Sequence, residues 1–189
     1  FVVDNVLVNV ATAAAQVGLE RTVVAQIAKE TITLLYPGPQ ELADRVPTSP
    51  LTDEKLVVFT DSRVLRDCAD CPPYAPVPVD ALQKIILRLY GPQATGQVQA
   101  ANVTSFSFEK LKAVLDGKAT AADVTLIEGS LRTASYLIFA MLDVASTEVP
   151  SSDMVKAFLR LRSDSLRDKK IIVLALNAPT VLAAKDASL

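Results

Sequence analysis

The chain has 189 residues, of which 50% are hydrophobic and 21% charged, a composition that excludes a disordered or fibrous protein and fits one ordinary domain. Nineteen basic and twenty-one acidic side chains leave a net charge of -2, which offers no broad positive field for phosphates, so we expect no nucleic-acid partner. The chain holds no histidine, which excludes a Ser-His-Asp triad, a Cys-His pair and any histidine-ligated metal site built from this chain alone.

The N-terminal part predicts a helix followed by a strand. Apolar residues keep a helical period from Val2 to Lys29, which indicates a linking helix over residues 1–30. Residues 31–35 alternate and are rich in β-branched side chains, a pattern typical of a strand. We therefore expect two parts, the linking helix at 1–30 and an α/β sandwich domain at 31–189.

Short apolar runs bounded by turn residues predict the further strands of a buried sheet. After residues 31–35, the predicted strands are Lys55–Thr60, Val98–Thr104, Val124–Ile127 and Ile171–Leu176. Amphipathic periodicity and capping residues predict helices between and after them. The predicted helix starts are Asp80, Ser107 and Ser151 or Ser152, the predicted stops are Gly91 and Gly117, and a further helix is predicted over Ala134–Ala145.

Strands that alternate with helices predict the α/β class, as a three-layer sandwich in which a mainly parallel sheet of about five strands is flanked by helices. Such sheets carry their sites in the loops beyond the carboxyl ends of the strands. We expect these loops to be Asp61-Ser62-Arg63, Glu128-Gly129-Ser130 and Asn177-Ala178-Pro179.

Cys68-Ala69-Asp70-Cys71 is a short motif with redox or metal chemistry. A redox pair needs its first thiolate at a helix N-terminus, but Pro72 and Pro73 follow this motif directly. A zinc site needs two further thiolate or imidazole ligands, which the chain lacks. Structural thiols, a disulfide-like pair and an oxidoreductase remain alternatives; we expect no metal, with Cys68 and Cys71 the candidate ligands if one bound.

The glycines do not form a nucleotide-binding fingerprint, so we expect no cofactor. No three of the six have the Rossmann spacing, and Lys112 stands where a phosphate loop ending in Gly117-Lys118 would need glycine. Two carboxylates, Asp61 and Glu128, follow predicted strands and are candidates for the acid pair of glycoside hydrolysis. Solvated loop carboxylates are the alternative interpretation.

Membrane and export signals are missing from the sequence. The longest unbroken apolar run, Tyr136–Leu142, is far shorter than the ~20 residues of a spanning helix, so we expect no membrane contact. The chain begins with Phe1 rather than Met, so we expect a piece of a longer protein. Two cysteines and no visible export signal favour a cytoplasmic location.

Three segments, in this order, carry a resemblance to a known family: Ala28-Lys29-Glu30-Thr31-Ile32-Thr33-Leu34-Leu35, Ala122-Asp123-Val124-Thr125-Leu126-Ile127, and Lys169-Lys170-Ile171-Ile172-Val173-Leu174-Ala175-Leu176-Asn177-Ala178-Pro179. The first resembles the A-x-x-a-I-T-L-L start of the C-terminal domain of family 3 glycoside hydrolases. The last resembles that domain's late strand and its Asn/Ser-x-Pro turn. Together the segments are most similar to bacterial two-domain β-N-acetylhexosaminidases.

The resemblance implies a division of labour with a second domain. In the family, an N-terminal (β/α)8 barrel binds the sugar and supplies an aspartate nucleophile and a His-Asp dyad. None of the barrel's motifs, such as Lys-His-Phe-Pro-Gly, occurs here, so we expect this chain alone to be inactive. The β-glucosidase branch takes a catalytic glutamate from the second domain, which leaves Glu128 as a candidate, although no family motif surrounds it. After Asn177-Ala178-Pro179 the sequence departs from the family pattern.

We therefore expect a non-catalytic ancillary domain of a glycosidase that cleaves terminal β-N-acetylglucosaminides. It would pack on the barrel of the same parent chain and rim its carbohydrate cleft, with an apolar patch left open when the barrel is absent. The candidate rim residues are Asp61, Arg63, Ser130, Arg132 and Asn177, and ordinary surface loops are the alternative for them. The alternative function is a free-standing flavodoxin-like module that binds a small ligand or regulates.

Overall fold

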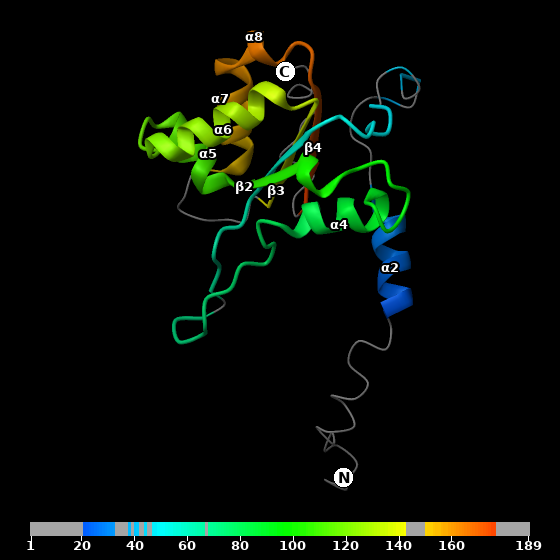
Figure 1. The fold of residues 1–189 in the computed structure, drawn as a ribbon. Coiled ribbons are helices and arrows are strands. Elements are labelled where there is room, and N and C mark those ends of the chain that lie inside the picture. The colour runs from blue at the N-terminus through cyan, green and yellow to red at the C-terminus, as the bar shows by residue number, and fades with distance from the viewer. Residues whose placement is uncertain are drawn as a thin grey trace, which may run out of the picture.

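The computed structural model describes residues 21–32, 38, 40, 41, 44, 47–66, 68–142 and 150–176 (Figure 1). In chain order these residues form α2 (Arg21–Glu30), β1 (Leu56–Thr60), α4 (Ala81–Tyr90), the 3-10 helix η2 (Ala100–Asn102), β2 (Val103–Ser107), α5 (Phe108–Leu115), α6 (Ala121–Thr133), β3 (Tyr136–Met141), α7 (Ser151–Leu161), α8 (Ser163–Leu166) and β4 (Lys170–Ala175). Within these residues, no helix is both long and apolar enough to cross a membrane.

The strands form one sheet in the order β2-β1-β3-β4, and every neighbouring pair is parallel. The predicted α/β class is confirmed, with four strands among the described residues rather than about five. From the carboxyl end of β1 the chain runs to β2, and from the carboxyl end of β3 it runs the other way, to β4. The carboxyl ends of β1 and β3 therefore form the switch point of the sheet.

Helices cover both faces of the sheet, which makes three layers (Figure 1). Successive strand residues point to opposite faces, so Val57 and Phe59 of β1 lie in one core and Leu56 and Val58 in another. The first core also takes apolar side chains from α5, α6, α7 and α8, and the second takes them from α4. Coverage on both faces explains why β1 and β3 are apolar runs, apart from Thr60 at the end of β1, and why all of their residues are buried.

Phe59 lies at the centre of the larger core. Its side chain is fully buried, and its ring stacks on the ring of Phe139 with centroids 5.4 Å apart. The rings of Phe106 and Phe158 lie at 5.7 and 6.0 Å from it. Because these four rings come from β1, β3, β2 and α7, one aromatic cluster joins three strands to the helical layer.

The predictions for residues 124–145 are wrong in two places. Val124–Ile127, predicted as a strand, lies inside α6, and Tyr136–Met141, predicted inside a helix, is β3. Both are short apolar runs, a pattern that does not by itself separate a strand from a buried helix. In α6 only Ile127 and Leu131 are buried, whereas all six residues of β3 are.

The other predicted elements agree more closely with the structure. β1 and β4 are confirmed to within one residue, and Gly91 ends α4, while β2 begins at Val103 rather than at Val98. The Ser107 hydroxyl caps α5 by accepting a hydrogen bond from the Lys110 amide at 3.3 Å. Beyond the end of α5, Gly117 has a φ of 67°, which glycine adopts without strain.

Two predicted caps have other roles, and two predictions fall outside the described residues. Asp80 precedes α4 but makes an ion pair with Lys84 rather than a side-chain cap. Ser151 and Ser152 are the first residues of α7, and Pro150 precedes them. Residues 1–20 of the predicted linking helix and residues 33–35 of the first predicted strand lie outside the described part of the chain.

Candidate functional site

The carboxyl end of β1 carries a buried ion pair at the switch point of the sheet. Asp61 follows the last residue of β1 and has no exposed surface, and Arg63 is 6% exposed. The Asp61 amide donates to the carbonyl of Ala140, which continues the pairing of β1 with β3. The side chains of Asp61 and Arg63 therefore start from a fixed backbone.

Arg63 holds the Asp61 carboxylate with two charge-assisted hydrogen bonds. Its Nε donates to Oδ1 at 2.8 Å and its Nη2 donates to Oδ2 at 2.5 Å. The Leu142 amide, just beyond β3, also donates to Oδ2, at 3.3 Å, and Arg63 Nη2 lies 3.5 Å from the Ser151 hydroxyl at the start of α7. One carboxylate thus ties together the ends of β1 and β3, and its arginine reaches α7.

Two opposing influences act on the pKa of Asp61. Burial raises the pKa, but hydrogen bonds from Arg63 and Ser151, the positive charge of Arg63 and the Leu142 amide together hold it below its usual value. The lowered pKa favours the ionised carboxylate, which forms an ion pair with Arg63. We call this pair, with its bond to Leu142, the Asp61–Arg63 clamp.

Of the four candidate rim residues that the structure describes, two are brought together. Asp61 and Arg63 pair with each other and are buried. Ser130 and Arg132 lie in the last part of α6, which leads into the amino end of β3, so they lie toward the opposite edge of the sheet. The expected loop at Glu128-Gly129-Ser130 is wrong because these residues are helical, and Asn177 lies outside the described residues.

Glu128 also pairs with an arginine of its own. Arg162, at the end of α7, donates to Glu128 through Nη1 at 3.3 Å and through Nη2. The pair borders a pocket of about 190 Å³ between α6, α7 and α8, which Arg132 and Lys169 also line. Asp61 and Glu128 thus lie in separate ion pairs, and the structure does not bring them together as the carboxylate pair of a glycosidase.

A polar network at the amino edge of the sheet was not predicted. Lys170 Nζ, at the start of β4, donates to the Tyr136 hydroxyl and to Glu54 Oε1, each at 2.9 Å. The Tyr136 hydroxyl donates to the Thr48 carbonyl at 2.5 Å. These residues are far apart in the sequence and share no motif, so no local pattern could have revealed the network. It fastens the segment before β1 to β3 and β4.

The Lys170 network predicts a pH dependence of stability. The hydrogen bond from the Leu51 amide and that from Lys170 hold the pKa of Glu54 below its usual value of 4.5. Between the two values the unfolded chain binds the extra proton, so stability rises with pH. The contribution is complete above 4.5 and is lost as pH falls through the lowered pKa of the folded protein.

Glu54→Gln should therefore lower the free energy of unfolding by about 1 kcal/mol near neutral pH, a small value for a bond to a charged group because Lys170 is partly exposed. The loss should shrink as pH falls below 4.5 and through the lowered pKa of Glu54 in the folded protein. Urea unfolding across this range measures it. Glu109→Gln, at an exposed position in α5, is the matched control. Parallel pH profiles for Glu54→Gln and the wild type would contradict the assignment.

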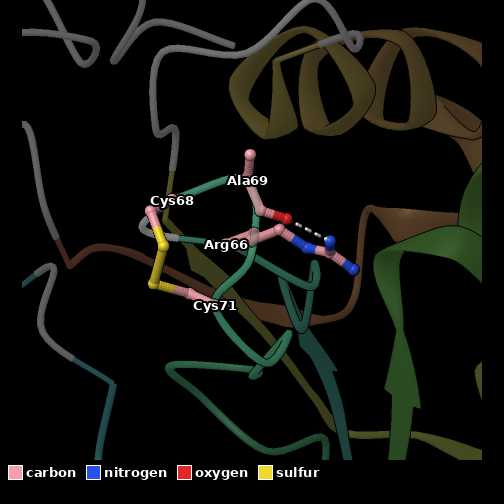
Figure 2. Close-up of a disulfide and its surroundings, with 4 residues drawn as sticks. All are labelled: Arg66, Cys68, Ala69 and Cys71. Carbon is pink, nitrogen blue, oxygen red and sulfur yellow. Dashed lines mark hydrogen bonds between the residues drawn. A yellow bond between two sulfur atoms is a disulfide. The ribbon is translucent and has the colours of Figure 1, made fainter.

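Cys68 and Cys71 form a disulfide (Figure 2). The alternative of free thiols is therefore wrong for this structure, and neither sulfur is the thiolate that zinc requires. In the turn that the disulfide closes, the Cys71 amide donates to the Cys68 carbonyl at 3.2 Å, and Arg66 Nη1 donates to the Ala69 carbonyl at 2.8 Å. Across the described residues, no group of three or more acidic or cysteine side chains is placed to hold a metal.

Comparisons with models of protein families, with curated proteins and with solved structures return no match for this chain. In the described part of the chain, the features that bear on its function are the Asp61–Arg63 clamp, the Glu128–Arg162 pair, the Lys170 network and the disulfide.

Proposed function

We propose that this chain is an ancillary domain of a glycoside hydrolase that cleaves terminal β-N-acetylglucosaminides. It packs on a catalytic (β/α)8 barrel of the same parent protein, and the barrel supplies the reacting groups. The activity is taken from the resemblance of Ala28–Leu35 and Lys169–Pro179 to the second domain of family 3 enzymes. The parallel α/β sandwich supports the proposal, because it agrees with the fold that the resemblance implies.

The apolar surface of α2 is the observation that carries the proposed packing. Val23, Val24 and Ile27 are 49%, 63% and 55% exposed, and every residue from 22 to 30 is exposed. A helix of ten residues is marginal in water unless an apolar side packs against something. A row of exposed apolar side chains on such a helix therefore favours a protein partner. The helix precedes the sandwich in the chain, where the linker from a barrel would arrive.

The state of the candidate carboxylates supports an ancillary role rather than a catalytic one. Asp61 is buried against Arg63, and Glu128 is bound by both terminal nitrogens of Arg162. A general acid needs a raised pKa, whereas Arg63 helps to hold the pKa of Asp61 below its usual value. The Glu128 carboxylate is bonded to an arginine side chain rather than open to a glycosidic oxygen.

The strand order β2-β1-β3-β4 favours a second candidate, a flavodoxin-like module that binds a small ligand at the switch point. The Asp61–Arg63 clamp weighs against it. Both oxygens of the carboxylate are already bonded within the protein at the described part of the switch point, so they are not available to a ligand.

The first test is to sequence the coding region upstream of Phe1. We expect it to encode, in the same reading frame, a barrel domain of about 250 residues with a Lys-His motif. In that parent protein, Val24→Lys combined with Ile27→Lys should weaken docking of the barrel by about tenfold or more, because two charges would enter an apolar contact. Hydrolysis of a chromogenic N-acetylglucosaminide and the Tm should both fall.

Thr22→Lys is the control for this test, because it adds one positive charge at an exposed polar position of the same helix. It should leave the rate of hydrolysis and the Tm near those of the parent. A stop codon and a start methionine directly before Phe1 would overturn the proposed function. Equal behaviour of Thr22→Lys and the double variant would overturn the role of α2.

A further inference from the structure

The Cys68–Cys71 disulfide lies in a segment that projects from the carboxyl edge of the sheet (Figures 1 and 2). The segment leaves β1 beyond the Asp61–Arg63 clamp and returns to α4. Cys68 is exposed, and Cys71 is half-buried. Cys68 is thus the more exposed residue of the pair.

Local bonds hold this segment in the shape of a hairpin. Leu65 and Tyr74 exchange two backbone hydrogen bonds, with N to O distances of 2.8 and 2.9 Å. Val64 and Tyr74 are 61% and 45% exposed, so the base of the hairpin is open to water. Exposed backbone hydrogen bonds open readily. The disulfide between Cys68 and Cys71, three residues apart in the sequence, is therefore the strongest constraint on this turn.

We propose that Cys68–Cys71 is a thiol–disulfide exchange site whose co-substrate is a dithiol, and that its reduction releases the hairpin of residues 65–74. The inference does not depend on the proposed function, because it uses only the loop and its two cysteines.

The reaction is a two-step exchange. A thiolate of the dithiol attacks Sγ of the exposed Cys68, the bond between the two cysteine sulfurs breaks, and Cys71 leaves as a thiolate that takes up a proton. The second thiolate of the co-substrate then attacks the co-substrate's own sulfur in the mixed disulfide and releases Cys68. Two electrons and two protons pass from the dithiol to the cysteine pair, and the dithiol becomes a disulfide.

The short spacing of the cysteines selects a dithiol over a monothiol. In the mixed disulfide, Cys71 remains three residues from Cys68 and attacks it, which expels a monothiol and restores the original bond. A dithiol carries a second thiol at comparably high local concentration, so it completes the reduction. Dithiothreitol should therefore reduce the pair at concentrations of thiol at which 2-mercaptoethanol leaves most of it oxidised.

The clamp limits how far the effect of reduction spreads. The Asp61 amide bonds to Ala140 within the sheet, and Arg63 holds Asp61 from the other side. Reduction should thus free the amides of Leu65 and Tyr74 while the amide of Asp61 stays protected. This difference separates the release of the hairpin from unfolding of the domain.

The test treats the folded chain with dithiothreitol, counts alkylated cysteines by mass spectrometry and measures amide hydrogen exchange residue by residue. We expect two alkylated thiols per chain without denaturant, and exchange at Leu65 and Tyr74 faster by about tenfold or more. Exchange at Asp61 should not change. Cys68→Ser combined with Cys71→Ser should show the faster exchange at Leu65 and Tyr74 without any reductant, and no response to dithiothreitol.

Three results would overturn the inference. The first is alkylation that requires denaturant, because the disulfide would then be closed to a co-substrate in the folded chain. The second is complete reduction with unchanged exchange at Leu65 and Tyr74, because the bond would then not hold the hairpin. The third is equal acceleration at Asp61, which would mean that reduction unfolds the domain.

Discussion

Asp61→Asn is expected to lower the free energy of unfolding by about 3–5 kcal/mol, because it removes the carboxylate from a buried ion pair and leaves the buried Arg63 charge without that anionic partner. Asparagine matches the size of aspartate, so the loss comes from charge and hydrogen bonding rather than from a cavity. The bonds from both Arg63 nitrogens and from the Leu142 amide lose their anionic acceptor. Guanidinium chloride unfolding, with the slope checked for two-state behaviour, measures the change.

Two further variants make the Asp61 result specific. Asp164→Asn removes a carboxylate that pairs with Arg167 at 3.3 Å but is 92% exposed, so it should cost no more than about 0.5 kcal/mol. Asp61→Asn combined with Arg63→Met should be more stable than Asp61→Asn alone, because it also removes the buried charge that had lost the Asp61 carboxylate. If Asp61→Asn costs no more than Asp164→Asn, the clamp does not stabilise the fold.

Phe59→Ala is expected to destabilise the protein by about 3–5 kcal/mol, the cost of a large cavity in a well-packed core. The Phe59 side chain is fully buried, and its ring lies 5.4 Å from that of Phe139 and 5.7 Å from that of Phe106. Its removal therefore withdraws contacts from two neighbouring strands and from α7 at once. Thermal and denaturant unfolding of the purified variant measure the loss.

Substitutions of graded size test the packing around Phe59. Phe59→Leu fills part of the space and should cost about 1–2 kcal/mol, less than the change to alanine. Leu161→Ala, at the exposed end of α7, removes an apolar side chain of similar size and should cost about 0.5 kcal/mol or less. A Phe59→Ala variant as stable as Leu161→Ala would contradict the central place of this ring.

The strands that could be predicted from the sequence are those whose side chains suit a buried parallel strand. Leu56–Thr60 and Lys170–Ala175 are short, mostly apolar and contain several β-branched residues, and a parallel sheet covered on both faces accepts such segments. The exchange of helix and strand between residues 121 and 141 had only a short local signal, the capping pair Thr120 and Asp123 at the start of α6. Val124–Ile127 has β-branched residues yet is helical, and the whole of Tyr136–Met141 pairs between β1 and β4. Tertiary context decided both.

The candidate site was predictable only where it depended on topology. Asp61 and Arg63 could be named because residues after a parallel strand gather at one edge of the sheet. Their burial against each other depends on α7 and on the Leu142 amide, which are distant in sequence. The prediction that Ser130 and Arg132 lie at the same edge was wrong, because the segment predicted as a strand before them is part of a helix. The cysteine spacing allowed several outcomes, and the structure contains the disulfide.

The strand order also sets the order in which the chain closes during synthesis. The ribosome delivers β2 before β3, yet β1 lies between them, so β1 keeps one edge unpaired until β3 has emerged from the ribosome. During that interval Leu56–Thr60, an apolar segment without charge, has open backbone groups that another chain could pair with. The stack of Phe59 on Phe139 forms only at the end of this interval. The time for which β1 is exposed to aggregation thus depends on how quickly the residues of α5 and α6 are synthesised.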